Sequence, residues 1–331
     1  MSFSRPTLKD VAKLSGVSEI SVSRVMRNAP NISNRLREKV EAAALALHYT
    51  PNKVAGALAS NTTDLIGVII PSLENPTYTQ ILAGIESVLG QSQYRMMLGV
   101  SNKSEKHEIK AVRDLLAWSP TGAIFVGEGY SDESYELLKR SKSTAIEILS
   151  NGETAVDIAY DFTYKTALAE LVQQWSEDGV KRVAYVESSQ NRSSLRDCQS
   201  LFRQALSTSG IESSLELIVE KEPSMQLGFE LCKQVLKQDP KIDAIFLAGE
   251  GFSTSRLMYN TGAGLPSEVA LASFSPQSRP KQLASSIDLI CLPLEKIGAD
   301  AAKLFLSGAK QHDSSISKKI TLPAEFFRCL R

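Results

Sequence analysis

The first 50 residues place apolar side chains at helical spacing in three successive segments. The inward positions are Leu8, Val11, Ala12 and Ser15, then Val22, Val25 and Met26, and then Leu36, Val40, Ala43 and Leu47. Gly16 ends the first predicted helix, while Ser18 and Ser33 are placed to cap the second and the third. Two short helices joined through a glycine form a helix-turn-helix, and a third helix completes a small core. The pattern predicts an all-α headpiece over residues 1–49.

A short segment, PNKVAGALAS at residues 51–60, follows the headpiece. Pro51 suits a first helical position, but a helix of two turns that contains Gly56 is too short to be stable in water by itself. Residues 50–61 are therefore interpreted either as a linker or as a hinge helix that orders only when something supports it.

The periodicity changes from Asp64 onward, because LIGVII at 65–70 is a continuous apolar run typical of a strand buried on both faces. Strands and helices then alternate in two series. Strands are expected at 65–70, 95–99, 123–126, 144–149, 182–186, 215–219, 244–247, 269–274 and 320–322, and helices at 78–89, 105–117, 132–140, 165–177, 195–208, 225–237, 253–261 and 295–307. This alternation predicts an α/β core with two parallel, doubly wound sheets.

Two turns in the predicted core are nearly the same string. AIFVGEGYS at 123–131 and AIFLAGEGFS at 244–253 each run from a buried strand into a Gly-Glu-Gly turn. Ligands bind beyond the carboxyl ends of parallel strands, so two facing lobes would place both turns on one central cleft. Neither turn completes GxGxxG, which makes a nucleotide site weakly supported, and coincidence between two short strings is the alternative.

Charge is unevenly distributed along the 331 residues. Residues 1–60 hold nine Lys or Arg against four Asp or Glu, so this part carries +5 and the remainder −5 in a chain of zero net charge. Such a basic segment is what contact with nucleic-acid phosphates requires, and it is favoured over a solvated basic face without a partner.

The cysteines and the apolar runs limit the class of protein. Cys198, Cys232, Cys291 and Cys329 stand far apart without a CxxC pair, which argues against a zinc site and for free thiols in a reducing compartment. The apolar runs are too short for a membrane span or a signal peptide. We expect a cytoplasmic protein that holds no metal and no cofactor.

The strings TLKDVAKLSGVSEISVSRVMRN at 7–28 and REKVEAAALALHYTPNKVAGALAS at 37–60 resemble the lac repressor family (LacI/GalR) of bacterial transcription regulators. IGVIIPSLENPTYTQILAGIESV at 66–88 looks most like gluconate-utilisation repressors. The resemblance implies a homodimer that binds a palindromic operator in double-stranded DNA. It also implies a periplasmic-binding-protein-like core over 62–331 that senses a small molecule, with an N-lobe at about 62–161 and 292–318 and a C-lobe at about 162–291 and 319–331.

The same resemblance assigns DNA contacts by position. The major groove would be met by Ser18, Glu19, Ile20, Ser21, Ser23 and Arg24, phosphates by Thr7, Asn31, Ser33 and Arg37, and the minor groove by Asn52, Lys53, Ala55 and Leu58. Arg24 can bond guanine bidentately, Ile20 can pack on a thymine methyl, and Glu19 can accept from cytosine or instead exclude wrong sequences. Leu58 would be an apolar wedge in the minor groove.

Effector-binding residues are expected at the cleft between the lobes. They are Ser72, Asn75, Tyr78, Glu128, Thr163, Tyr164, Arg192, Arg196, Glu250, Phe274 and Ser275. Asn75 and Tyr78 match the family pattern, whereas Cys198 stands where family members usually keep an arginine. Further departures are Thr163-Tyr164, Gly249-Glu250 and Ser275. Three explanations stay open: a different ligand, such as a sugar acid held by Arg192 or Arg196; an alignment shifted by gaps; or a pocket that no longer senses a sugar.

Two other function classes compete with a regulator. An enzyme is disfavoured because His48, His107 and His312 do not assemble with a nucleophile, although Glu128 and Glu250 could pair as in a glycosidase. A solute-binding protein fits the core but not the basic headpiece. We therefore predict a repressor of a carbohydrate or sugar-acid operon that is not an enzyme. The sequence leaves open which operator is bound and which effector is sensed. It also leaves open whether the effector releases or recruits DNA, and whether the protein activates some promoters.

Overall fold

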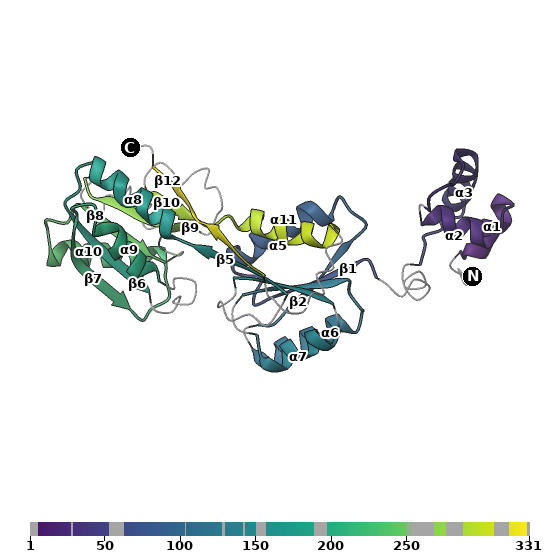
Figure 1. Ribbon diagram of the computed structural model, residues 1–331, viewed down its shortest axis with the longest axis horizontal. Coiled ribbons are helices and arrows are strands. Elements are labelled where there is room, and N and C mark those ends of the chain that lie inside the picture. Colours follow the sequence, from purple (N-terminus) through teal and green to yellow (C-terminus); the bar gives the residue numbers. More distant parts are fainter. Residues whose placement is uncertain are drawn as a thin grey trace. The chain divides into compact units, whose positions relative to one another are not determined.

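The computed structural model describes residues 6–27, 29–52, 63–102, 104–127, 130–141, 143–149, 157–188, 197–249, 252, 268–275, 287–307 and 318–329. The chain divides into two compact units, Met1–Thr62 and Thr63–Arg331. The described part of the first unit contains the helices α1, α2 and α3, and the second unit is an α/β core with two sheets; both are labelled in Figure 1. Each unit is described separately below.

The headpiece consists of α1 (Leu8–Ser15), α2 (Glu19–Met26) and α3 (Asn34–Ala46). Side-chain caps begin all three helices: the Thr7, Ser18 and Ser33 hydroxyl oxygens each accept a backbone N–H three residues further on. Gly16 ends α1 with a left-handed φ of +63°. The small core contains Val11, Ala12, Val22, Val25, Val40, Ala43 and Ala44. The three predicted helices and their caps are confirmed.

The first sheet has the strand order β11-β5-β4-β3-β1-β2, and all its pairs are parallel. Its strands are β1 (Leu65–Ile70), β2 (Arg95–Val100), β3 (Gly122–Val126), β4 (Thr144–Ile148), β5 (Ile158–Thr163) and β11 (Lys318–Pro323). The helices α5 (Pro76–Leu89) and α11 (Leu294–Leu306) cover one face, and α6 (Glu105–Leu116) and α7 (Asp132–Ser141) cover the other (Figure 1). These elements form the first lobe.

The second sheet has the order β12-β10-β9-β8-β6-β7, with β12 antiparallel to β10 and the other pairs parallel. Its strands are β6 (Arg182–Ser188), β7 (Glu212–Val219), β8 (Ala244–Ala248), β9 (Ala270–Ser275), β10 (Asp288–Cys291) and β12 (Glu325–Phe327). The helices α8 (Lys165–Glu177) and α9 (Cys198–Leu206) pack on one face and α10 (Met225–Gln238) on the other. These elements form the second lobe.

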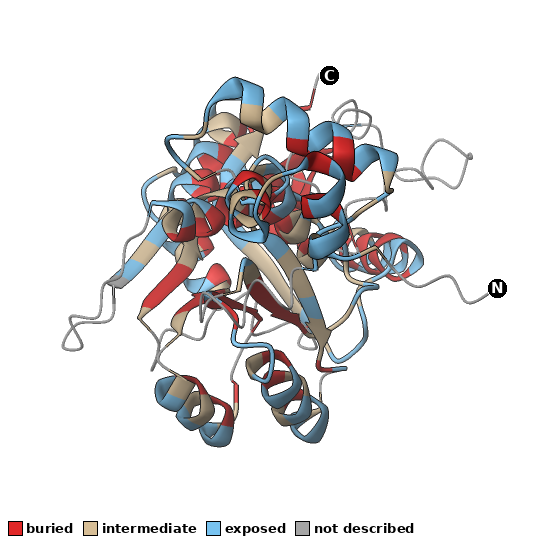
Figure 2. Ribbon diagram, turned by 90° about the vertical axis from the view of Figure 1, so that its right-hand side faces the viewer, coloured by how far each residue is buried: buried red, intermediate tan, exposed pale blue. Residues whose placement is uncertain are grey.

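Apolar runs in the sequence become strands that are buried on both faces. Every residue of the predicted strands β3, β8 and β9 is buried, as expected for sheets covered by helices on both sides, and so is every residue of β10. Figure 2 shows buried residues in red on the strands and on the inner sides of the helices, whose outer sides are pale blue. The predicted parallel α/β architecture is therefore confirmed.

The helices α5 and α11 approach closely enough for backbone contact. A Cβ added to Gly84 would lie 2.0 Å from the Glu295 carbonyl oxygen, and one added to Gly298 would lie 2.2 Å from the Ile81 carbonyl oxygen. A larger residue at either position would push the helices apart. The first lobe is thus closed by a helix that comes from a distant part of the chain.

Four strands and two lobe boundaries differ from the prediction. The strands β5, β10 and β12 were not predicted, and β11 extends over 318–323 rather than 320–322. Since β11 pairs with β5 along its length, the first lobe reaches Thr163 and then Pro323, and the predicted boundaries at 161 and 319 are corrected. The predicted helix at 253–261 lies outside the described residues.

Candidate nucleic-acid interface and effector site

The helix α2 separates an inward apolar face from an outward polar one. Val22 and Val25 are buried, whereas Ile20 is 74% exposed and Glu19 and Arg24 are exposed as well. An isoleucine at this exposure is costly in water and suits contact with an apolar group such as a thymine methyl. The predicted DNA-facing residues of α2 therefore share one side of the headpiece.

Two of the polar side chains on this side are already held by neighbours. The Arg27 guanidinium donates to the Ser23 hydroxyl at 2.8 Å and to the Ser23 carbonyl at 3.3 Å. Arg24 donates only a long hydrogen bond, 3.5 Å, to the Pro30 carbonyl. Arg27 was not among the predicted contacts. Its spacing of four residues from Ser23 on a helix is the signal that could have indicated it.

The predicted phosphate contacts lie at helix starts. Thr7 and Ser33 precede α1 and α3, and their hydroxyl oxygens are engaged in capping, so first-turn backbone N–H groups remain as anion donors. Asn31 is exposed and has a left-handed φ of +61°. The Arg37 guanidinium nitrogen Nη1 lies 3.9 Å from the Glu41 carboxylate oxygen Oε1.

Of the four residues predicted to contact the minor groove, only Asn52 belongs to the described part of the chain. Asn52 is exposed at the end of the described headpiece. The other three predicted minor-groove residues, Lys53, Ala55 and Leu58, lie outside the described residues.

In the first lobe, the carboxyl ends of β1 and β3 bring two predicted effector segments together. Gly127 has φ +110°, and a Cβ added there would lie 2.7 Å from Pro71 Cγ and 4.0 Å from the Tyr78 hydroxyl oxygen. The turn after β3 therefore packs against the PSLENPTY loop that holds Ser72, Asn75 and Tyr78. Glu128 lies outside the described residues.

The polar side chains of this loop also shape it. The Asn75 side-chain oxygen caps α5 by accepting from the Thr77 N–H at 2.9 Å, and the Ser72 hydroxyl accepts from the Glu74 N–H at 3.1 Å. Both residues are partly exposed, as is Tyr78. Their arrangement leaves part of each side chain accessible at the carboxyl edge of the sheet.

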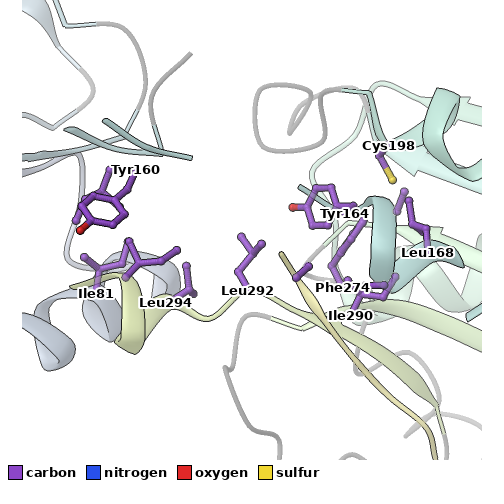
Figure 3. Packing of buried hydrophobic residues seen from close by; sticks show 14 of the residues in the cluster. Ile81, Tyr160, Tyr164, Leu168, Cys198, Phe274, Ile290, Leu292 and Leu294 are labelled. Carbon is purple, nitrogen blue, oxygen red and sulfur yellow. The ribbon is translucent and has the colours of Figure 1, made fainter. Parts of the chain in front are cut away.

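In the second lobe, the remaining described effector residues are mostly buried. Tyr164 is 3% exposed and packs on Phe274 with ring centroids 4.5 Å apart (Figure 3). Ser275 is 4% exposed and hydrogen-bonds the Cys291 thiol. Thr163 is partly exposed, and its carbonyl accepts from the Ala324 N–H at 2.9 Å, where two connections between the lobes run side by side. Arg192, Arg196 and Glu250 lie outside the described residues.

Cys198, at the position where the resemblance leads one to expect an arginine, is fully buried at the start of α9. Burial raises the pKa of its thiol to about 12, against the lowering effect of a hydrogen bond with Tyr185. The Tyr185 hydroxyl donates to the carboxylate of Glu187, which is 6% exposed near the end of β6. Glu187 was not among the predicted site residues, although a glutamate directly after the apolar run RVAYV was a usable signal.

Comparison with protein families agrees with both units. The model for the periplasmic binding proteins and sugar binding domain of the LacI family matches residues 63–328, and the model for bacterial regulatory proteins of the lacI family matches residues 7–52. The chain belongs to the LacI family. Within that family it is similar to the HTH-type transcriptional regulator GntR of Escherichia coli (strain K12), with 27% identity over 326 residues that cover 97% of this chain and 96% of GntR.

Solved structures of LacI-family proteins have the same fold. A LacI-family transcriptional regulator from Silicibacter pomeroyi superimposes with a TM-score of 0.72 at 28% identity, covering 98% of this chain and 100% of that one. The lac repressor dimer bound to operator and the anti-inducer ONPF gives a TM-score of 0.78 at 22% identity, with 98% of both chains covered.

These findings show a DNA-binding transcriptional regulator of the LacI family with an effector-binding domain. The named relatives are regulators, not enzymes. Within the described ranges, no helix combines the length and apolar character that crossing a membrane requires. All four cysteines are among the described residues, where they are buried and form no disulfide with one another, in line with the prediction from their spacing.

Proposed function

We propose that this LacI-family regulator represses an operon for carbohydrate or sugar-acid use, and that a gluconate-like effector controls its operator binding. Two observations support the choice of ligand class. Residues 66–88 resemble gluconate-utilisation repressors, and the similarity to GntR extends over 97% of the chain. The family assignment makes a cytoplasmic site of action the expected one.

The observation that carries the DNA-binding role is the outward side of α2. Arg24 and Ile20 are exposed there while Val22 and Val25 hold the helix to the headpiece core. Arg24 would read guanine, Ile20 would pack on a thymine methyl, and Glu19 would accept from cytosine or exclude wrong bases. Ser18, Ser21 and Ser23 would complete this surface, with Thr7, Asn31, Ser33 and Arg37 near phosphates and Asn52, Lys53, Ala55 and Leu58 in the minor groove.

A homodimer on a palindromic operator follows from the symmetry that such sites demand. The edge strand β2 supports this assembly, because Leu98 is 39% exposed and Met96 and Met97 are only partly buried. An edge strand that shows apolar side chains to water is typically covered by another chain. A second copy bound there would bring two headpieces to one operator.

Effector control would act at the carboxyl edges of the two sheets. Ser72, Asn75, Tyr78, Glu128 and Thr163 would bind the ligand from the first lobe, and Tyr164, Arg192, Arg196, Glu250, Phe274 and Ser275 from the second. A ligand that binds one arrangement of the lobes better shifts the regulator toward that arrangement, and with it the affinity for DNA.

Cys198 favours a second candidate, a LacI-type regulator whose cleft no longer senses a sugar. A buried, protonated thiol supplies neither the charge nor the donors of an arginine. The two candidates differ only in the ligand. The match of the lacI-family model to residues 7–52 sets aside the solute-binding alternative, and removal of residues 1–60 should abolish operator binding.

The deciding experiment measures fluorescence anisotropy on an operator selected from random DNA, at fixed salt. A panel of gluconate-like acids and neutral sugars is added in turn. A change in operator affinity with one acid supports the sugar-acid effector. Binding to a palindromic operator that responds to no compound of the panel supports a regulator whose cleft no longer senses a sugar.

Arg24→Ala tests the base-reading role in the same assay. We expect it to relax base preference at one position by about 1–3 kcal/mol. Arg35→Ala, which removes the same charge from an exposed position of α3, is the control and should leave the preference profile unchanged. If both variants lower affinity equally for every sequence, Arg24 contacts phosphate and does not read bases.

A further inference from the structure

A carboxyl group is buried inside the first lobe, away from the DNA-facing and effector-facing residues. Glu147 is 1% exposed in β4, an interior strand of the first sheet. Phe125 of β3 and Ala159 of β5 flank it in register. Its side chain enters the layer between the sheet and the helices α6 and α7, where most buried residues are apolar or aromatic and the polar ones include Glu108 and Ser134. An ionised carboxylate is strongly disfavoured in such surroundings.

Only one oxygen of this carboxyl group has a partner. The Tyr135 hydroxyl of α7 donates to Oε1, whereas Oε2 is buried without a hydrogen-bond partner among the described residues. Nearly all buried polar atoms in folded proteins are hydrogen-bonded, so an unpartnered oxygen indicates a specific cause. Here Glu147 holds α7 to the sheet through a single hydrogen bond and leaves half of the carboxyl group unsatisfied.

The ionisable groups facing Glu147 add no positive charge. They are Tyr135 on α7, Glu108 on α6 and Tyr130 in the loop before α7. Glu108 accepts from the N–H and the hydroxyl of Ser131, both at 2.9 Å. Among the described residues, no basic side chain forms an ion pair with Glu147. The ion pair between Arg113 of α6 and Glu133 of α7 lies at the surface, with side chains 61% and 49% exposed, and is separate from the buried Glu147.

Burial raises the pKa of Glu147, and the hydrogen bond from Tyr135 only partly opposes this effect. Burial also raises the pKa of Tyr135, as do its hydrogen bond to Glu147 and the nearby negative charges, so this phenol remains a donor. The layer thus contains acidic groups whose neutral forms are favoured, and the position of α7 depends on them.

We propose that Glu147 binds a proton when the first lobe folds, and that its ionisation at higher pH loosens α7 from the first sheet. The folded chain then binds one more proton than the unfolded chain between the two ionisation ranges of this group. The contribution of Glu147 to stability is therefore largest at low pH and falls as pH rises, by up to about tenfold in the folding equilibrium constant for each pH unit.

The site lies next to the segment that leads into the turn after β3. Tyr130 donates to the carbonyls of Val126 and Ile69 at 2.9 and 3.2 Å, and its ring packs edge-on against Phe125. Loosening of α7 would therefore reach the carboxyl end of β3. Proton binding at Glu147 does not depend on the proposed function, and it would add sensitivity to pH to any effector response at that edge.

Glu147→Gln in the full-length protein tests the proposal by thermal unfolding between about pH 5 and about pH 8. Glutamine keeps the shape and an acceptor for Tyr135 but cannot ionise. The melting temperature of the wild type should fall with rising pH by several degrees more than that of Glu147→Gln. Glu133→Gln, which removes an exposed carboxylate from the same helix, should retain the wild-type pH profile.

Identical pH profiles for the wild type and Glu147→Gln would overturn the proposal. If Glu147→Gln does not fold, hydrogen–deuterium exchange of the wild type replaces it, with α5 as the internal reference and intrinsic rates corrected. Exchange in α7 that accelerates relative to α5 as pH rises supports the proposal. A constant ratio of the two helices rejects it.

Discussion

The two sheets have the same strand order, yet they differ in the polar side chain buried at one equivalent position. When Gly127 is aligned with Gly249, β3 corresponds to β8. Phe125 in β3 is paired with Glu147 and its equivalent Leu247 in β8 is paired with Ser273, so Glu147 and Ser273 occupy equivalent positions in the two sheets. Ser273 is fully buried and donates to the Leu247 carbonyl at 2.9 Å. Glu147 has an oxygen without a partner among the described residues. The same position thus accepts a satisfied hydroxyl in one lobe and a half-satisfied carboxyl in the other.

The difference shows that the strand order does not dictate how buried polar groups are paired. The second lobe also buries an acid, Asp288, but both of its oxygens accept: one from the Trp175 indole N–H at 3.1 Å and one from the Cys329 N–H at 2.9 Å. The Ser273 hydroxyl does not ionise, whereas a half-satisfied buried carboxyl makes stability depend on pH because burial penalises its ionised form. We therefore expect the first lobe to respond to pH more than the second.

The largest expected effect is that of Asp288→Ala in the second lobe. Two buried N–H donors would lose their acceptor, which should lower the free energy of unfolding by about 2–5 kcal/mol in urea titration. Asp114→Ala is the control, because it removes an ion pair with Lys110 in which the side chains are 60% and 72% exposed, and should cost less than about 1 kcal/mol. Equal losses for the two variants would mean that Asp288 does not stabilise the lobe through its buried contacts.

Gly127→Ala should come next and should affect the first-lobe turn more than Gly249→Ala affects its counterpart. Alanine at φ +110° is strained, and its Cβ would meet Pro71, so we expect a loss of about 2–4 kcal/mol and a weaker effector response. Gly179→Ala has φ +84° but open space around it, so it measures backbone strain alone. A loss no greater than that of Gly179→Ala would exclude a role for the Pro71 contact.

Tyr135→Phe sharpens the contrast in pH response. The hydrogen bond from the Tyr135 hydroxyl lowers the pKa of Glu147, so loss of this hydroxyl raises the pKa of Glu147 further and penalises the ionised carboxylate. We expect a loss of about 1.5–3 kcal/mol near pH 8 and a smaller loss near pH 5, measured by urea unfolding. A loss that is the same at both pH values would show that the hydroxyl contacts a neutral group throughout.

Ser273→Ala should have the smallest effect. It removes a hydrogen bond to a backbone carbonyl that has other partners, so we expect a loss of about 0.5–1.5 kcal/mol in urea titration. The loss should not change between about pH 5 and about pH 8, since no titrating group is removed. A clear pH dependence would contradict the contrast between the lobes.

Local signals made the headpiece predictable. Gly16, Ser18 and Ser33 define helix ends by contacts within three or four residues, so the sequence suffices. The near-identical strings at 123–131 and 244–253 were less reliable. The letters AIF align them one residue out of register with the structure, since Phe125 faces α6 and α7 whereas Phe246 faces α9. A shift of one residue turns a strand side chain to the opposite face.

The missed elements depend on distant partners. The strand β12 has three residues and exists through its antiparallel pairing with β10, and β5 contains Asp161, which interrupts its apolar pattern. Glu147 was expected in a strand, but whether its oxygens find partners depends on α7 and could not be read from TAIEI. The candidate effector residues at the carboxyl edges are proposals for the same reason: their positions follow from topology, while their chemistry depends on side chains of both lobes.

The pairing of β5 with β11 and of α5 with α11 also sets an order of events during synthesis. The first lobe begins at Leu65 but is complete only when Pro323 has been made, roughly 13–52 s later at 5–20 residues per second. The headpiece has its own core and can fold long before that moment. Until β11 arrives, β5 is an open strand edge that any other extended chain could occupy. A nascent regulator is therefore able to fold its DNA-binding part well before the lobe next to it is protected from aggregation.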